Sequence, residues 1–274
     1  MKISDILPGP DARISYDEFV AELFKLRSSL SSPVERRSAS RYYVIGDIHG
    51  DLITFRRILE RIGEIGDDEV LITLGDYGDR GPYQVETWIG ISALKQVLRD
   101  RYVPLRGNHE PDAASVPYPH DITDKLRERF GSERSEMAYA ELFNTFQVLP
   151  LVFLGDDFIA LHGGFPIHPF SLDNENEVRR SAHEILWNDP FEGLGFMPSP
   201  RGIGFLFGKD ITVKWLMLNS KRFLIRGHEP AEGYKLNHDG LVITVFSRIG
   251  EPYFNRTAAM AVIEGGNVSF ELFY

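Results

Sequence analysis

Short apolar runs recur along the first half of the chain, and each ends in a polar turn that contains glycine. The runs are Tyr42–Ile45, Val70–Leu74 and Tyr102–Leu105, and their β-branched and aromatic residues are typical of strands. The segments between them, residues 52–62 and 85–98, place apolar residues at helical spacing. Strands that alternate with helices in this way predict βαβ units and a largely parallel sheet.

In the second half of the chain, the alternation of strands and helices gives way to a pattern that predicts hairpins. Gly155-Asp156-Asp157 separates two apolar runs, and Gly265-Gly266 separates two more. The strand candidates of this half are Val152–Leu154, Phe158–Leu161, Phe223–Ile225, Leu241–Phe246, Ala259–Ile263 and Val268–Leu272. A parallel half followed by hairpins predicts an α/β fold in which two mixed β-sheets pack as a central sandwich, flanked by helices.

The length of 274 residues allows one large domain or two small ones, and we expect a single domain over residues 1–274. Ser15 and Glu18 have the spacing of a capping box at the start of a helix over residues 15–30. The segment 28–40 is rich in Ser, Arg and Glu and is expected to be a linker. Residues 1–40 are therefore interpreted as an N-terminal helix plus a linker.

The composition excludes several classes of function. The chain has no cysteine, so disulfides, thiolate zinc sites and cysteine-based phosphatase chemistry are impossible. A formal net charge of −10 argues against a nucleic-acid partner, which usually meets a basic patch. The chain lacks an apolar N-terminal leader and any apolar stretch of about 18 residues, so we expect no membrane partner and a cytoplasmic location.

Five turns that follow predicted strands carry residues suited to metal chemistry. They are Gly46–Gly50, Gly75–Gly81, Arg106–Glu110, His162–Gly164 and Arg226–His228. Each brings Asp, His or Asn to the carboxyl end of a strand, where open α/β sheets bind their ligands. Carboxylate, imidazole and amide groups together suit a divalent transition metal such as manganese, iron or zinc.

Each turn taken alone has a simpler explanation. Gly-Asp and Asp-Gly pairs are common turn residues, and a lone His-Gly-Gly or Arg-Gly-His indicates little. Their order along the chain is a stronger observation, because Asp76 follows Asp47 by 29 residues and Asn108 follows Asp76 by 32. Each interval is the length of about one βαβ unit, roughly 30 residues. We therefore expect the five turns to converge on one metal site.

These turns resemble the signature blocks of the phosphoprotein phosphatase (PPP) family, a branch of the calcineurin-like metallophosphoesterases. Leu186–Pro190 and Arg201–Gly208 resemble two further segments of its serine/threonine members, and the resemblance covers roughly residues 15–265. It implies the metallophosphoesterase fold and a metal-dependent serine/threonine protein phosphatase of prokaryotic or archaeal type. It also implies phosphorylated proteins as substrates, and the sequence gives no sign of a regulatory subunit.

The resemblance further implies a dinuclear metal centre. One ion is expected on Asp47, His49 and Asp76. The other is expected on Asp76, Asn108, His162 and His228, so that Asp76 bridges the two ions. The ions are expected to be divalent or trivalent, with manganese in vitro and iron or zinc as the other candidates. A hydroxide that bridges them would attack phosphorus directly, and the ions reverse the local charge of an acidic protein.

The same resemblance assigns the other catalytic roles. His109 is the implied general acid for the leaving serine or threonine alkoxide, and Asp79 holds its imidazole. Arg80 and Arg201, together with Asn108, are implied to bind the phosphate of the substrate. The histidines outside the blocks are expected to be surface or structural residues: His120, His168, His183 and His238.

One loop departs from the family pattern. Serine/threonine members carry Ser-Ala-Pro-Asn-Tyr where this chain has Ser247–Pro252, and Tyr253 is a candidate replacement for the missing tyrosine. Two other activities stay open on the same core, namely hydrolysis of diadenosine tetraphosphate and dual-specificity action that includes phosphotyrosine. A catalytically inactive binding scaffold is a third alternative, and the complete set of expected ligands and catalytic residues argues against it.

Overall fold

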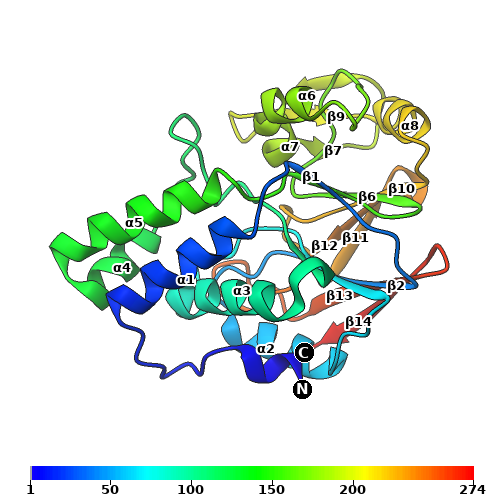
Figure 1. Cartoon of the computed structure of the whole chain (residues 1–274). Helices are drawn as coiled ribbons and strands as arrows, with labels where there is room; N and C mark the ends of the chain where they lie inside the picture. The colour runs from blue at the N-terminus through cyan, green and yellow to red at the C-terminus, as the bar shows by residue number, and fades with distance from the viewer. Residues whose placement is uncertain (1) are drawn as a thin grey trace.

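The computed structural model describes residues 2–274 and has two large β-sheets at its centre (Figure 1). The five-stranded sheet consists of β2 (Arg41–Ile45), β3 (Glu69–Thr73), β4 (Tyr102–Pro104), β13 (Ala258–Glu264) and β14 (Asn267–Phe273). Its order is β14-β13-β2-β3-β4, in which β2, β3 and β4 run parallel and the β13–β14 hairpin is antiparallel. The predicted parallel units and this hairpin are thus confirmed.

The six-stranded sheet is also mixed. Its strands are β1 (Val34–Arg36), β5 (Val152–Leu154), β6 (Phe158–Leu161), β10 (Phe223–Arg226), β11 (Tyr234–Asn237) and β12 (Val242–Val245). They lie in the order β1-β5-β6-β10-β12-β11, and β10 is parallel to both of its neighbours. The fold class predicted from the sequence, two mixed sheets flanked by helices, is confirmed.

The two-residue periodicity of the strands explains the layers. In β2, Tyr42 and Val44 belong to the apolar cluster between the sheets, where they meet residues such as Phe158 of the other sheet. The alternate residues Tyr43 and Ile45 belong to a second cluster that contains the helices packed against the outer face. Successive side chains of a strand point to opposite faces, so one strand contributes to both cores.

Helices cover the outer faces of both sheets (Figure 1). On the side of the five-stranded sheet, α2 (Leu52–Ile62) and α3 (Gln84–Leu98) contact its strands. Outside α3 lie three further helices that pack on α3 or on one another, namely α1 (Tyr16–Ser28), α4 (Ile122–Phe130) and α5 (Ser132–Phe146). Against the six-stranded sheet lie α6 (Glu175–Arg180), α7 (Ala182–Trp187) and α8 (Lys209–Leu218). As the capping-box spacing predicts, the Ser15 hydroxyl accepts a hydrogen bond from the Glu18 backbone nitrogen at the start of α1.

Three features of the fold differ from the expectation. The segment expected to be a linker contains β1, and β11 was missing from the strand candidates. A third, small sheet has the order β7-β9-β8, formed by β7 (Asp189–Pro190), β8 (Phe196–Pro198) and β9 (Phe205–Phe207). These strands have two to four residues and mostly lack buried side chains, so they leave no apolar pattern in the sequence.

The carboxyl ends of the parallel strands meet at one edge of the sandwich. Asp47, just after β2, forms an isolated parallel bridge with Phe246, just after β12. This bridge brings the two sheets together where the predicted polar turns emerge.

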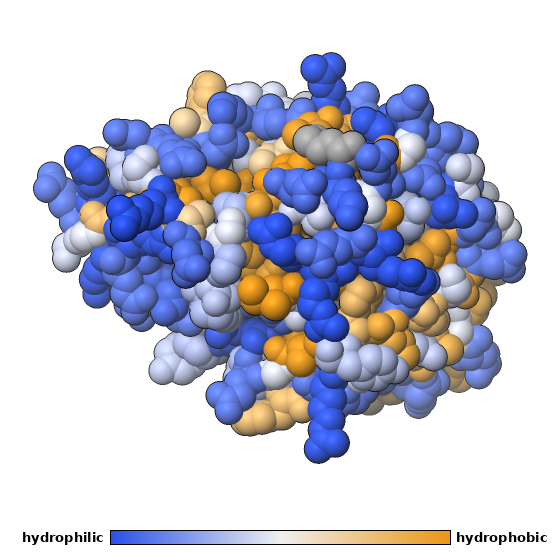
Figure 2. Space-filling view, turned by 90° about the horizontal axis from the view of Figure 1, so that it is seen from below, coloured by the Kyte–Doolittle hydropathy of each residue, from blue (hydrophilic) through white to orange (hydrophobic). Residues whose placement is uncertain are grey.

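The surface is mixed in character. Hydrophilic side chains cover most of the underside of the molecule, with hydrophobic patches between them (Figure 2). Among residues 2–274, no helix has both the length and the apolar character needed to cross a bilayer.

Candidate metal centre and active site

The five polar turns converge at this edge. Asp47 follows β2, Asp76 follows β3, Asn108 follows β4, His162 follows β6 and His228 follows β10. All five residues are 5 % exposed or less. Segments that are far apart in sequence therefore place carboxylate, amide and imidazole groups in one buried cluster.

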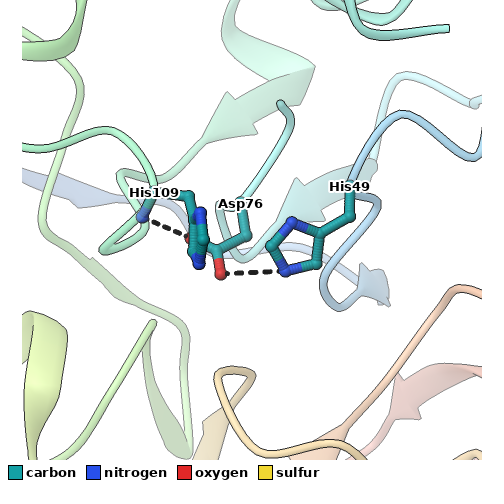
Figure 3. A group of neighbouring side chains, drawn as sticks. All are labelled: His49, Asp76 and His109. Carbon is teal, nitrogen blue, oxygen red and sulfur yellow. Dashed lines mark hydrogen bonds and ion pairs between the residues drawn. The ribbon is translucent and has the colours of Figure 1, made fainter. Parts of the chain in front are cut away.

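Asp76 is the central residue of this site, and Figure 3 shows it between the side chains of His49 and His109. Its Oδ2 lies 3.3 Å from Nε2 of His49, and its Oδ1 lies 3.4 Å from Nε2 of His162. Oδ1 also accepts a hydrogen bond from the backbone nitrogen of His109 at 2.9 Å. The two carboxylate oxygens of Asp76 thus face two different groups of side chains, so this residue is placed where two ions could share it.

Backbone carbonyl groups fix the orientation of two histidines. Nδ1 of His49 donates to the oxygen of Gly78, and Nδ1 of His162 donates to the oxygen of Leu74, both at 2.9 Å. With the proton on Nδ1, the lone pair of Nε2 points into the cluster in each case. Metal-binding histidines are held by hydrogen bonds of this kind.

The surroundings of Asn108 fit a cation better than a hydrogen bond. Its Oδ1 lies 2.8 Å from Nε2 of His162 and 2.8 Å from Nδ1 of His228. Because the proton of His162 is on Nδ1, the contact between its Nε2 and the amide oxygen joins two acceptors with no hydrogen between them. A positive ion coordinated by all three groups removes this conflict, and the donor set suits a transition metal.

Two groups of possible ligand atoms share Asp76. The atoms of the group Asp76, His162 and His228 all lie within 4.8 Å of one another, as do those of the group His49, Asp76 and His109. Asp47 adjoins both, since its Oδ2 is 3.9 Å from Nε2 of His49 and its Oδ1 accepts from the backbone nitrogen of His228 at 2.9 Å. The residues present therefore fit a pair of ions.

Two glycines allow this close packing. A Cβ atom on Gly107 would lie 2.2 Å from Oδ1 of Asp76, and one on Gly227 would lie 2.3 Å from Oδ1 of Asp47. Both distances are far inside van der Waals contact, so any side chain at either position would displace a carboxylate of the cluster.

The buried negative charge of the two carboxylates in the cluster also favours the binding of cations. Burial raises the pKa of Asp47, and the neighbouring Asp76 raises it further. Burial acts in the same direction on Asp76, but His162 and His109 outweigh it and hold the pKa of that carboxyl well below its usual value. Two adjacent carboxylates in a buried site are stable only with positive partners.

A histidine–aspartate pair adjoins the metal-ligand cluster. Nδ1 of His109 lies 2.6 Å from Oδ2 of Asp79, whose side chain is fully buried. The ring of His109 meets the ring of His49 edge to face at 4.7 Å between centroids. Burial lowers the pKa of His109, although Asp76 and Asp79 act in the opposite direction. Since Asp79 engages Nδ1, Nε2 is the nitrogen that can serve a substrate.

Comparison with known proteins places this arrangement in a family. A sequence model of the calcineurin-like phosphoesterases matches residues 40–232, a span that contains every residue of the cluster. The chain belongs to this family.

Relatives of this phosphoesterase include protein phosphatases. A probable serine/threonine-protein phosphatase of Encephalitozoon cuniculi is 30% identical over 224 residues, which are 78% of this chain and 48% of that protein. The chain thus spans about half the length of this curated relative.

Solved structures share the fold. A Saccharomyces cerevisiae serine/threonine phosphatase with similarity to human phosphatase PP5 has a TM-score of 0.84 at 23% identity, over 94% of this chain and 89% of that one. A cold-active protein-tyrosine phosphatase of a Shewanella species has a TM-score of 0.63 at 16% identity, over 91% of this chain and 84% of that one.

The two arginines predicted to bind phosphate lie at the margin of the site in this phosphoesterase. The guanidinium group of Arg80 donates to the oxygen of Pro119 at 3.0 Å. Nε of Arg201 donates to Oδ2 of Asp189 at 2.8 Å, and Oδ1 of the same carboxylate is 3.9 Å from Nε2 of His228. Asp189 therefore links Arg201 to the metal-ligand cluster.

Tyr253, the candidate replacement for the family tyrosine, lies against the cluster. Its hydroxyl is 3.0 Å from Nε2 of His49, and the guanidinium carbon of Arg248 lies 5.3 Å from its ring centroid. Burial, together with the charges of Asp76 and Asp47, raises the pKa of Tyr253 to about 12. The hydroxyl is therefore protonated at neutral pH and can donate a hydrogen bond.

Glu110, the last residue of one of the five turns, has a structural role that no sequence pattern predicts. The carboxylate of Glu110 accepts from the backbone nitrogens of Asp76 at 2.8 Å, Tyr77 at 2.9 Å and Gly107 at 2.8 Å. Glu110 therefore ties two of the five turns together.

His120 has a structural position, one of the two expected for it, but the sequence did not indicate its partners. Its side chain is 8 % exposed and contacts Asp79, so it is not a surface residue. His168 and His183 are exposed, and His238 is buried in contact with Thr212, as expected for surface and structural residues.

Proposed function

We propose that this phosphoesterase is a metal-dependent serine/threonine protein phosphatase that acts on phosphorylated proteins. One observation carries the proposal: Asp76 is shared by two groups of candidate metal ligands, and one of these groups includes His109, which Asp79 orients. A metal centre can supply the nucleophile for hydrolysis of a phosphomonoester, and an acid of this kind can protonate its alkoxide leaving group.

We assign Asp47, His49 and Asp76 to the first ion, because both carboxylates lie beside Nε2 of His49. The second ion is assigned to Asp76, Asn108, His162 and His228. Ions held by these residues would neutralise charge on the phosphoryl group and would lower the pKa of a water molecule, so that hydroxide would be available as nucleophile at neutral pH. Manganese is the ion expected to support activity in vitro, and iron and zinc are the alternatives.

The protein's own groups handle the leaving group and the phosphate. His109 donates a proton from Nε2 to the departing oxygen, while the negative charge of Asp79 at Nδ1 stabilises the imidazolium form. Burial would raise the pKa of Asp79, but hydrogen bonds from His109 and His120 hold it well below its usual range, so this charge is present at all physiological pH values. Arg80 and Arg201 supply planar guanidinium groups for the phosphate oxygens.

Two considerations favour serine and threonine esters over the other candidate substrates. An alkoxide must be protonated as it leaves, whereas the tyrosine phenolate and the phosphate of a nucleotide anhydride leave with less help. The buried pair of His109 and Asp79 meets the more demanding case. The Encephalitozoon cuniculi relative, whose name describes a probable serine/threonine-protein phosphatase, supports the same choice.

Phosphate release tests this proposal directly. The purified chain would be stripped of metal, reloaded with manganese, iron or zinc, and assayed on a phosphoserine peptide, a phosphotyrosine peptide and diadenosine tetraphosphate. We expect metal-dependent turnover, with a higher kcat/KM for the phosphoserine peptide than for the phosphotyrosine peptide or diadenosine tetraphosphate. A higher kcat/KM for diadenosine tetraphosphate would refute the proposal. A His109→Asn variant should lose turnover of the phosphoserine peptide. Its control is His168→Asn, because His168 is exposed and lies outside the site.

A further inference from the structure

Asp79 accepts hydrogen bonds from three directions. Its Oδ2 is 2.6 Å from Nδ1 of His109 and 2.7 Å from Nδ1 of His120. Its Oδ1 accepts from the backbone nitrogen of Ile122 at 2.9 Å, at the start of α4. The side chain of Asp79 is fully buried, so these donors replace water around its negative charge. His120 is the donor that the proposed mechanism does not use.

The second nitrogen of His120 is also occupied. Nε2 lies 3.0 Å from the hydroxyl of Tyr139 in α5, and the two rings meet edge to face at 5.6 Å between centroids. A neutral imidazole with its proton on Nδ1 satisfies both contacts, since it donates to Asp79 and accepts from the Tyr139 hydroxyl. The tautomer and the orientation of His120 are thus fixed by its two neighbours.

The segment that carries His120 also holds a phosphate-binding candidate. The guanidinium group of Arg80 donates to the oxygen of Pro119, and the backbone nitrogen of Arg80 donates to Oδ1 of Asp121 at 2.9 Å. Residues 119–121 therefore contact both Asp79 and Arg80, which follow each other in the chain.

We propose that His120 is a positioning residue: it holds the Asp79 carboxylate in the orientation that aligns His109, and Tyr139 in turn holds His120. The resulting connection runs from Tyr139 in the helical layer through His120 and Asp79 to the general acid. It acts on the protonation of the leaving group and leaves the metal ligands untouched. This inference rests on the proposed phosphatase function and on His109 as its acid.

A third metal ion is the competing explanation, because ligand atoms of Asp79, His109 and His120 also lie within 4.8 Å of one another. The observed distances of 2.6 and 2.7 Å to Asp79 are those of charge-assisted hydrogen bonds, and Tyr139 occupies the remaining nitrogen of His120. The geometry therefore favours a hydrogen-bonded connection.

Three substitutions separate positioning from a general structural role. His120→Leu removes both hydrogen bonds, and His120→Asn keeps an amide donor at the position of Nδ1. Tyr139→Phe removes only the hydroxyl beyond His120. Each variant, with His168→Leu as an exposed-histidine control, would be assayed on a phosphoserine peptide and on para-nitrophenyl phosphate, whose phenolate leaves without a proton.

We expect a loss confined to the substrate that needs the acid. In His120→Leu, kcat for the phosphoserine peptide should fall by about 10- to 100-fold, less than the loss expected from removing an acid outright. Its KM and its turnover of para-nitrophenyl phosphate should change by less than about 3-fold, and Tyr139→Phe should lose about 3-fold in kcat. His120→Asn should recover turnover to within about 3-fold of the parent.

Three results would overturn the inference. The first is an equal loss of kcat on both substrates in His120→Leu. The second is a loss of kcat on the phosphoserine peptide in His120→Asn as large as that in His120→Leu. The third is unchanged turnover of the phosphoserine peptide in His120→Leu. Elemental analysis tests the competing explanation. A third equivalent of metal in the unsubstituted protein that is lost in His120→Leu would show that Asp79, His109 and His120 bind an ion.

A spectroscopic readout keeps this inference distinct from the proposed function. In the metal-free protein, the Nδ1 protons of His109 and His120 on Asp79 should give two downfield resonances. His120→Leu should remove one of them and shift the other. Two unchanged resonances in His120→Leu would refute the connection between His120 and His109. If the unsubstituted protein turns over no phosphoserine peptide, the proposed function is refuted, and the resonances still decide whether the connection exists.

Discussion

The substitution Asp79→Asn should disable the general acid while leaving the metal centre intact. Oδ1 of Asp79 accepts from the backbone nitrogen of Ile122, so the introduced amide would keep its oxygen there and turn its NH2 group towards Nδ1 of His109. His109 would then carry its proton on Nε2 in a neutral ring, with no negative charge to stabilise the imidazolium form that acts as an acid.

The structure sets the size of this effect. The lost contact is a charge-assisted hydrogen bond of 2.6 Å. Hydrogen bonds to charged groups are worth about 1.5–3 kcal/mol, which corresponds to about 10- to 150-fold in rate. The upper limit is the full contribution of an acid–base group, about 10²–10⁴-fold. We expect kcat for a phosphoserine peptide to fall by about 10²-fold.

The assay compares two leaving groups at constant metal content. Turnover of para-nitrophenyl phosphate should fall by less than about 5-fold, because its leaving group needs no proton from the general acid. Elemental analysis should find the same metal content in parent and variant, since Asp79 is not among the proposed ligands. An equal loss on both substrates at full metal content would refute the assignment of Asp79 and His109 to leaving-group protonation.

The remaining predictions concern the acid, the close packing of the ligands and the pH dependence of stability. His109→Asn should keep its metal and lose about 10²–10⁴-fold in turnover of the phosphoserine peptide, and full activity would remove His109 from the mechanism. Gly227→Ala places a Cβ atom 2.3 Å from Oδ1 of Asp47. Metal affinity measured by calorimetry should therefore fall by at least about 10-fold, which is the lower end of the loss seen when groups that orient metal ligands are changed. Unchanged affinity would contradict the close approach of Gly227 and Asp47. Burial would raise the pKa of Asp189, but Arg226 leads the positive groups that hold it well below its usual value. The stability that this carboxylate contributes should therefore be complete above about pH 4 and decline below it, and urea unfolding between about pH 2 and 6 should show a smaller acid loss in Asp189→Asn than in the parent.

Much of the fold was accessible from the sequence because its main strands are apolar and end in recognisable turns. β2 and β3 begin and end within one residue of the predicted runs, and the β13–β14 hairpin turns at Gly265-Gly266 as expected. Strands such as β11 escaped prediction, because three of its four residues are exposed and its pairing depends on β12, a partner supplied by the tertiary structure.

The candidate site also contains some residues that the sequence predicts and others that only the tertiary structure reveals. Its proposed metal ligands follow strands directly, so sheet topology alone brings Asp76 and His162 to the same edge. His120 lies 41 residues after Asp79, in a segment without periodicity, and its contact with that carboxylate depends on the path of a loop. No local pattern encodes such a contact, and the role of Glu110 in binding three backbone nitrogens is equally invisible before the turns are folded.

The proposed activity depends on two ions that share Asp76 at the edge where the two sheets meet. The most direct measurement is anomalous X-ray diffraction from crystals grown with manganese. We expect two anomalous peaks next to Asp76, one beside His49 and the other beside His162 and His228. A single peak, or peaks only at the group formed by Asp79, His109 and His120, would contradict this expectation.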